Sequence, residues 1–189
     1  MNLKKTGLAA VLAAAGFTPF LFADDLEEAA VALYAINKSG IDISRALDIA
    51  EQKIAGVVYE YELDEHDELL VHEFEIADFE AEKKYKIKIA VNDGSVVEQS
   101  DEKMKCGKLV CKDDDGKSAR ALQASEYSLR KALTQLELPP RQLLLEAELE
   151  FERGVRYMKL EVVGPDGERD ILVDIATGQI IPSLSHTMQ

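Results

Sequence analysis

Apolar and polar positions alternate with a period of two along six stretches of this chain: 57–63, 70–76, 85–91, 145–151, 158–162 and 171–175. This alternation is typical of half-buried antiparallel strands, with one face on a core and one in water. In 57–63 it predicts inward-facing Val57, Tyr59, Tyr61 and Leu63. In 145–151 it predicts inward-facing Leu145, Ala147, Leu149 and Phe151, and outward-facing glutamates between them.

Three other stretches have apolar residues three or four positions apart, which predicts helices. Two of them begin after a capping-type residue, Asp42 in one case and Ser128 in the other. Gly56 ends the first of these helices, and Pro139 with Pro140 stops the second. A third helix is expected within 24–38, as an extra amphipathic helix that packs on the first group of strands.

The helix-and-strand pattern occurs twice, with a nearly constant offset. The caps are 86 residues apart (42 to 128), and the turn glycines Gly94 and Gly178 are 84 apart. A fixed offset of this kind indicates an internal repeat. The predicted fold class is therefore α+β, with two tandem modules, each a helix packed on a small antiparallel sheet, preceded by the extra N-terminal helix.

The first 23 residues have the pattern of an export signal. Lys4 and Lys5 precede an apolar run at 7–17, and Ala23 stands before an acidic pair. The run is too short for a typical spanning helix, which favours cleavage after Ala23 over retention as an anchor. Without 1–23 the net charge changes from −14 to −16, since two lysines are lost. This acidity disfavours nucleic acid as a partner, and we expect no membrane span after cleavage and a periplasmic or secreted location.

The segment 171–181 resembles the closing signature of the PepSY family, a strand with an aspartate, a Thr-Gly turn and a short apolar strand. Asp174, Thr177 and Gly178 carry this resemblance, and Tyr127-Ser128-Leu129 and Ile41-Asp42-Ile43 fit the family's opening signature. The second copy is the better match, because Asn92-Asp93-Gly94 lacks the Thr-Gly pair. The resemblance implies a first module within 24–99, together with the extra helix, a second at 125–183 and a tail at 184–189. It also implies a role in restraining peptidases or in the cell envelope.

A polar stretch at 100–124 is interpreted as a linker between the modules, and it contains the only two cysteines, Cys106 and Cys111. In an oxidising compartment, a pair at this spacing favours a structural disulfide. A redox-active pair is disfavoured by the lack of Cys-x-x-Cys spacing. A zinc site is disfavoured because two further ligands at a useful spacing are missing.

The remaining candidate residues do not assemble into a recognisable active site. His66, His72 and His186 have no metal-binding spacing, and we expect His72 to be a core residue. The run 113–115 of three aspartates lacks the spaced ligands of a calcium loop and is interpreted as a solvated acidic turn. No nucleophile elbow, phosphate loop or dinucleotide motif occurs. The sequence therefore predicts a protein that is not an enzyme and has no cofactor and no metal site.

Two classes of function stay open. The first is an exported binding module whose partner is an unidentified protein, with a secreted peptidase that it inhibits or modulates as the leading candidate. The alternative is an acidic metal-cation-binding envelope protein, or a structural partner of a membrane protein. The candidate binding surface consists of outward-facing acidic residues: Glu146, Glu148, Glu150, Glu152, Asp170 and Asp174.

Overall fold

A computed structural model describes residues 21–106 and 111–182 of the chain. The first 20 residues of the predicted export signal and the whole of the predicted tail at 184–189 lie outside the described residues. The elements in chain order are α1 (Leu21–Ser39), α2 (Ile43–Lys53), β1 (Val57–His66), β2 (Leu69–Asp78), β3 (Lys83–Ala90), β4 (Val96–Lys103), α3 (Asp114–Ser125), α4 (Leu129–Leu136), β5 (Leu143–Glu152), β6 (Val155–Gly164), β7 (Gly167–Asp174) and β8 (Ile180–Ile181).

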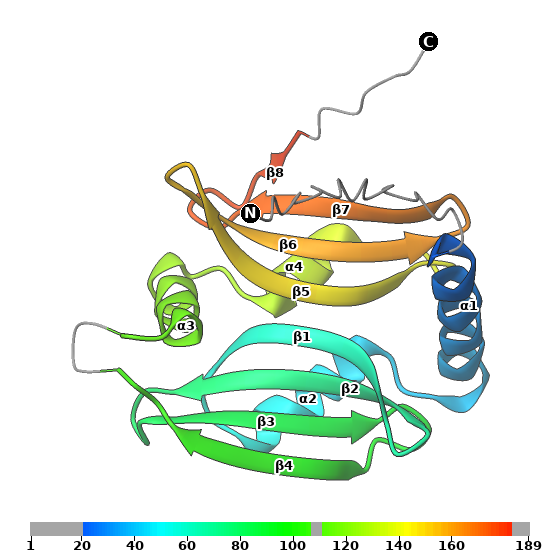
Figure 1. Ribbon diagram of the computed structural model, residues 1–189, viewed down its shortest axis with the longest axis horizontal. Helices are drawn as coiled ribbons and strands as arrows, with labels where there is room; N and C mark the ends of the chain where they lie inside the picture. Colours follow the sequence, from blue (N-terminus) through cyan, green and yellow to red (C-terminus); the bar gives the residue numbers. More distant parts are fainter. Residues whose placement is uncertain (1–20, 107–110, 183–189) are drawn as a thin grey trace, which may run out of the picture.

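The strands form one sheet of eight in the order β4-β3-β2-β1-β5-β6-β7-β8 (Figure 1). Each half of the chain folds into an antiparallel meander, and the first strands of the two meanders pair at the centre. The central ladder is short, with Tyr61 opposite Ala147 and Glu62 opposite Glu146. The expected α+β class is thus confirmed, but the two small sheets predicted from the sequence are one continuous sheet.

Two local features, a helix cap and a closing glycine turn, occur in both halves of the chain. Asp42 caps α2 by accepting from the Arg45 N–H at 2.8 Å, and Ser128 caps α4 by accepting from the Lys131 N–H at 3.2 Å. The closing turns also agree, since Gly94 and Gly178 have φ angles of 75° and 70°. These left-handed values favour glycine at both positions.

A β-bulge near the start of each central strand changes the predicted face assignments. The register shifts between Val58 and Glu60 in β1, and between Leu144 and Glu146 in β5, again 86 residues apart (58 to 144). One extra residue in a strand reverses the side on which the preceding side chains point. Val58 therefore lies opposite Ile76 in the core.

The bulges overturn part of the predicted inward-facing set. Tyr59 is buried and belongs to the main core, as expected, but its hydroxyl donates to Glu75, which lies on the opposite face from Phe74 and Ile76. In β5, Leu144 belongs to the main core, whereas Leu145 is only partly buried. Phe151 was expected to be buried but is 65% exposed, with the Arg156 guanidinium 5.2 Å from its ring centre.

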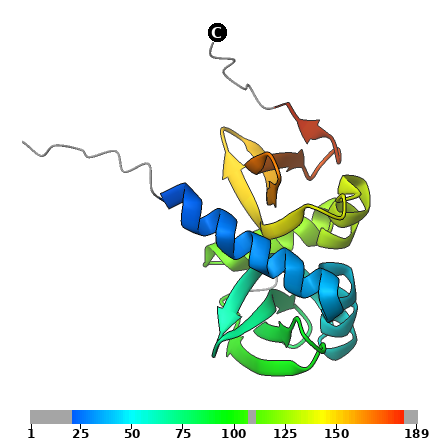
Figure 2. The same cartoon turned by 90° about the vertical axis from the view of Figure 1, so that its right-hand side faces the viewer.

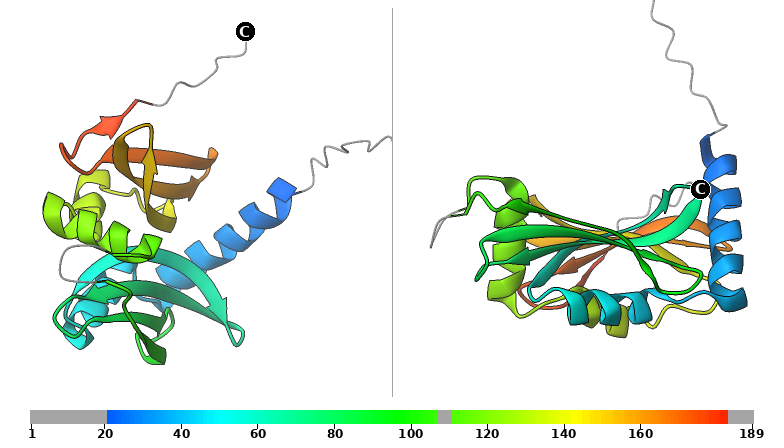
Figure 3. Two further views of the ribbon diagram at one scale, coloured as in Figure 1. Left: turned by 60° about the vertical axis from the view of Figure 1, so that its left-hand side comes forward. Right: turned by 90° about the horizontal axis from the view of Figure 1, so that it is seen from below.

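The main hydrophobic core lies between one face of the sheet and helices α2 and α4. It joins residues of both halves: Leu47, Tyr61, Phe74 and Ile76 with Leu129, Ala132, Met158 and Leu160. Figure 3 shows α2 and α4 on the same side of the sheet, with α1 and α3 at its two ends. The opposite side, between α1 and α3, is not covered by any helix of the described residues, and we call it the open face.

Helix α1 crosses the strand ends of both halves (Figure 2). Its buried Ala29 and Ala32 form a second apolar cluster with Leu143 and Val163, against which Leu63, Leu70 and Leu145 also pack. The helix predicted at 24–38 is therefore present. It packs on the first group of strands through Leu63 and Leu70, as expected, and also on the second half, because the shared sheet brings strand ends of both halves to the same place.

The stretch 100–124, which we expected to be a linker, contains the end of β4 and most of α3. Ala119 and Leu122 of α3 are buried in the main core together with Met104. The predicted disulfide joins Cys106 and Cys111, and Gly116 in the first turn of α3 lies against it. This segment thus forms part of the folded structure.

Candidate functional site

The open face carries rows of charged side chains that the register of the strands brings side by side. Glutamates of β2 flank lysines of β3, and glutamates of β1 lie next to glutamates of β5. Lys159 and Glu161 of β6 continue the charged surface beyond β5. On β2 and β3 the positive and negative charges of this surface balance each other. Where β1 meets β5, negative charges are in excess.

The balanced part lies on β2 and β3, where a row of glutamates pairs with a row of lysines. The Lys88 ammonium is 2.7 Å from Glu73 and 3.0 Å from Asp64, and Lys86 pairs with both Glu73 and Glu75. Burial raises the pKa of Glu73, but hydrogen bonds from Lys86 and Lys88 outweigh it, so the pKa lies below its usual value. Glu73 is therefore ionised and fully engaged.

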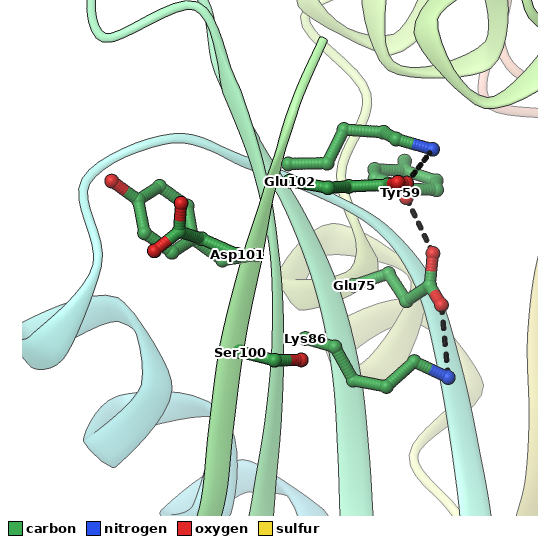
Figure 4. Close-up of a pocket in the computed structure, with 8 residues that line it drawn as sticks. Tyr59, Glu75, Lys86, Ser100, Asp101 and Glu102 are labelled. Carbon is green, nitrogen blue, oxygen red and sulfur yellow. Dashed lines mark hydrogen bonds and ion pairs between the residues drawn. The ribbon is translucent and has the colours of Figure 1, made fainter.

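A second group of contacts ties α3 to the sheet. Lys84 pairs with Asp115 of α3 at 2.5 Å and with Glu102 of β4 at 2.7 Å. Beneath it, a pocket of about 230 Å³ is lined by Tyr59 and Glu75 among others. Figure 4 shows the chain of contacts from Tyr59 through Glu75 to Lys86.

The contacts in this pocket hold its polar groups in place. Burial and the hydrogen bond to Glu75 raise the pKa of Tyr59, so its hydroxyl stays protonated and donates to the Glu75 carboxylate. Asp101 points to the other side of β4 and pairs with Lys83 at 2.8 Å (Figure 4). The pocket therefore resembles a structural anchor for α3 more than a reaction site.

The unbalanced part is the junction of β1 and β5, where Glu60 and Glu62 meet Glu146 and Glu148. We call these four residues the acidic seam. Glu62 and Glu146 are direct register partners, which sets two like charges side by side. Within the part of the chain that the structure describes, the lysine near the seam on the β6 side is Lys159. Its ammonium nitrogen lies 3.6 Å from the Glu148 carboxylate.

The pKa values of the seam carboxyls reflect this crowding. Burial, followed by the charges of Glu75, Asp115 and Glu148, raises the pKa of Glu60 to about 7. Burial and the neighbouring Asp64 and Glu73 carboxylates raise that of Glu62.

On β5, burial and the Glu148 carboxylate raise the pKa of Glu146, against the opposing effect of Lys159. Carboxyl groups in this state favour a nearby positive charge, because it would lower the energy of their ionised form.

A groove runs along the α1 side of the seam, and we call it the α1 groove. Its volume is about 760 Å³. Helix α1 forms one wall and the ends of β1, β2, β5 and β6 form the other, with these lining residues: Ala29, Val31, Ala32, Ala35, Glu62, Leu63, Asp64, Glu65, Glu68, Leu70, Leu145, Glu146 and Glu161. The groove therefore shares Glu62 and Glu146 with the acidic seam.

The structure brings only part of the predicted binding surface into this site. Glu146 and Glu148 belong to the seam. Glu150 accepts a hydrogen bond from the Tyr157 hydroxyl at 2.6 Å, and Glu152 lies 3.3 Å from Arg153 at the end of β5. Asp170 lies on β7 and contributes to the field at Lys159.

Asp174 has a structural role in the predicted family turn. Its carboxylate accepts from the Ala176 N–H at 2.8 Å and the Thr177 hydroxyl at 3.0 Å. The Gly178 N–H donates to the Asp174 carbonyl at 2.7 Å. Asp174, Thr177 and Gly178 thus form the expected turn, which leaves Asp174 engaged within it.

Sequence reasoning missed Glu60 and Glu62 as site residues. The signal that could have found them is the repeat itself, because they correspond to Glu146 and Glu148 at the same offset of 86. What the offset does not reveal is that the two equivalent strands pair with each other.

Histidine and aspartate candidates for metal binding are engaged elsewhere. His72 is 1% exposed, with the Tyr61 hydroxyl 3.1 Å from Nδ1 and the Ile41 carbonyl 3.0 Å from Nε2, so the expectation of a core histidine is confirmed. His186 lies outside the described residues.

The aspartates at 113–115 were interpreted as a solvated turn, but they begin helix α3. Asp113 caps it by accepting from the Gly116 N–H at 2.8 Å, and Asp114 pairs with Lys117. Acidic side chains at a helix N-terminus are favoured by the helix dipole. Across residues 21–106 and 111–182, no group of three or more His, Cys, Asp or Glu side chains has an arrangement that could hold a metal ion.

The fold and the site define a small α+β protein with one helix-covered sheet face and one open, acidic face. Residues 40–99 match the family model described as peptidase propeptide and YPEB domain (PepSY). The matched residues are those of α2, β1 to β3 and the first part of β4, so the similarity to the PepSY family lies in the first half of the chain. We expected the second half to match the family better, but the match falls on the first half. The glycine turn occurs in both halves, so it does not decide which half matches the family.

Two solved structures are similar to this chain. A protein of Clostridium difficile 630 described as a lipoprotein shares 20% identity, with a TM-score of 0.41 over 76% of this chain and 92% of that one. The YpmB protein from Bacillus subtilis shares 15% identity, with a TM-score of 0.26 over 74% of this chain and 94% of that one. No curated protein matches the sequence. None of the helices in the described part of the chain is long and apolar enough to cross a membrane.

Proposed function

We propose that this protein is a non-catalytic binding module that acts outside the cytoplasm and restrains a secreted peptidase by holding one of its segments. The observation that carries the proposal is the position of the PepSY domain. Its first strand forms half of the acidic seam, at the centre of a sheet face that α1 and α3 flank and leave uncovered.

The physical properties of the open face suit binding better than chemistry. Its lysines pair with glutamates of β2, which holds these side chains in place on the sheet. The seam adds a negative charge at the centre, which Lys159, 3.6 Å from Glu148, offsets only in part. Charge complementarity of this kind speeds association and selects partners. A positively charged segment of the peptidase is the matching partner.

The predicted export signal supports a location outside the cytoplasm, as does the disulfide between Cys106 and Cys111. A periplasmic or secreted protein would meet secreted peptidases in the same compartment.

The test is an inhibition assay with the purified protein and peptidases secreted by the same organism. Cleavage of an internally quenched peptide is followed as the protein is added. We expect one peptidase to lose activity at close to equimolar protein and to form a complex with it on gel filtration. Restored activity at high salt would agree with a charged interface.

The matched variants are Glu62→Gln with Glu146→Gln in the seam, and Glu80→Gln with Glu82→Gln in the exposed turn between β2 and β3. Both pairs remove two negative charges, but only the first should weaken inhibition. Complexes with no loss of peptidase activity, or capture of a membrane protein alone, would contradict the peptidase role and favour the structural-partner alternative.

A further inference from the structure

The α1 groove has the size and shape of a ligand site. At about 760 Å³ it lies within the range of about 300–1,000 Å³ that is common for such sites. Ala29, Ala32 and Ala35 recur along the wall that α1 provides, and their small side chains keep the groove open. The strand ends of both halves form the opposite wall.

Apolar side chains occur on both walls of the groove. Leu63, Leu70 and Leu145 line it from the sheet side and are only partly buried. On α1, Val31 lines the groove and is 63% exposed. A groove with these side chains can bury apolar groups of a ligand, which is the main source of affinity at such surfaces.

The rest of the lining is acidic. Six carboxylates line the groove, and none of its described lining residues is basic. Lysines approach two of the carboxylates, Asp64 at 3.0 Å and Glu161 at 3.6 Å. Glu62 and Glu146 instead face each other as register partners, where a cation between them would reduce their repulsion.

We propose that the α1 groove binds a polypeptide segment in which basic and apolar side chains alternate, with the apolar groups against the leucines and the basic groups on the acidic rim. The proposal rests on the proposed function and names the kind of segment that the peptidase would supply. Small and apolar walls with a rim of one charge select against acidic segments and against purely apolar ones.

The test uses protein expressed from the full 189-residue sequence and three fluorescent ten-residue peptides. One alternates lysine and leucine, one alternates glutamate and leucine, and one alternates lysine and serine. Fluorescence anisotropy measures binding at low and high salt. The lysine–leucine peptide should bind at least about tenfold more tightly than either of the others, because only it matches both the rim and the walls.

Two variants locate the site. Glu62→Gln with Glu146→Gln should weaken binding of the lysine–leucine peptide by about threefold to tenfold. Ala35→Phe should fill the groove with a larger side chain and leave its charge unchanged. It should weaken binding of the lysine–leucine peptide by more than about tenfold. The control is Glu80→Gln with Glu82→Gln, at the far end of the sheet, and melting temperatures check that each variant is folded.

Two results would overturn the proposal in favour of simple attraction of cations. One is that the lysine–serine peptide binds as tightly as the lysine–leucine peptide. The other is that spermine, added to the same total positive charge as the lysine–leucine peptide, displaces that peptide completely. Unchanged binding in both the seam pair and Ala35→Phe would overturn the location. The peptidase assay separates the two proposals. Inhibition that persists in the groove variants, with no peptide binding, refutes the groove and leaves the peptidase role standing.

Discussion

Replacement of Glu60 by glutamine should stabilise the protein at neutral and higher pH, and this gain should disappear in mild acid. The pKa of Glu60 rises from its ordinary value of 4.5 to about 7 in the folded state, mainly because of burial and then because of the Glu75, Asp115 and Glu148 charges. The unfolded chain releases this proton near pH 4.5 and the folded chain only near pH 7. Stability contributed by Glu60 is therefore fully present below pH 4.5 and is lost as the pH rises through 7.

The magnitude follows from the size of the change in pKa. At about 1.36 kcal/mol per pKa unit, the rise from 4.5 to about 7 has an upper limit of about 3.4 kcal/mol. Glu60 keeps some contact with water, which screens its charge. We therefore expect Glu60→Gln to raise the free energy of unfolding by about 1–2 kcal/mol at pH 8 and by close to zero at pH 4.5.

Urea unfolding of both proteins at pH 4.5, 6 and 8 measures this difference. The control is Glu80→Gln, since Glu80 is exposed in the turn between β2 and β3 and its change should alter stability by no more than about 0.5 kcal/mol. An equal gain for Glu60→Gln at all three pH values would show that packing, and not ionisation, is responsible. No gain at pH 8 would refute the crowding of charges at the seam.

Three further changes test the core, the disulfide and the union of the two halves. Tyr61→Phe should cost about 1–2 kcal/mol in urea unfolding, since the buried hydroxyl contacts His72 and its loss leaves the ring nitrogen without this donor; an unchanged midpoint would contradict this. Replacement of Cys106 and Cys111 by serine should lower the free energy of unfolding by about 2 kcal/mol, because the unfolded chain regains loop entropy. Amide hydrogen exchange should become faster mainly in α3, which packs on the disulfide. Exchange that changes equally everywhere would argue against local loosening. Leu160→Ala should cost about 2–5 kcal/mol and shift one common unfolding transition, because Leu160 lies in a core shared by both halves; two separate transitions by calorimetry would show that the halves fold independently.

The local elements of this fold could be predicted from the sequence because each depends on a short-range pattern. Alternation identified every strand longer than two residues except β4, and the capping residues Asp42 and Ser128 marked the two core helices. Asp174, Thr177 and Gly178 marked the turn before β8. The disulfide followed from the cysteine spacing and the predicted compartment.

The parts that could not be predicted depend on which distant segments meet. A bulge leaves Tyr59 without a register partner and lets its hydroxyl reach Glu75, although the alternating pattern around it is unchanged. The pairing of β1 with β5 is a contact between residues more than 80 positions apart, and nothing local in either strand specifies it. Helix α3 was missed because its first turn is a run of aspartates, which reads as a solvated turn until Asp113 is seen as a cap.

The acidic seam follows from the way in which two equivalent strands meet. Glu60 and Glu62 correspond by the repeat offset to Glu146 and Glu148, and antiparallel pairing of equivalent strands then sets glutamate beside glutamate. Burial and the neighbouring carboxylates raise the pKa of Glu60, so we expect its ionised form to lower stability at neutral pH. Proteins commonly carry destabilising groups of this kind where they serve function. The same logic gives a sharp expectation: if the seam binds a cationic segment, Glu60→Gln should become more stable and bind that segment less tightly, whereas a seam without function would gain stability and lose nothing.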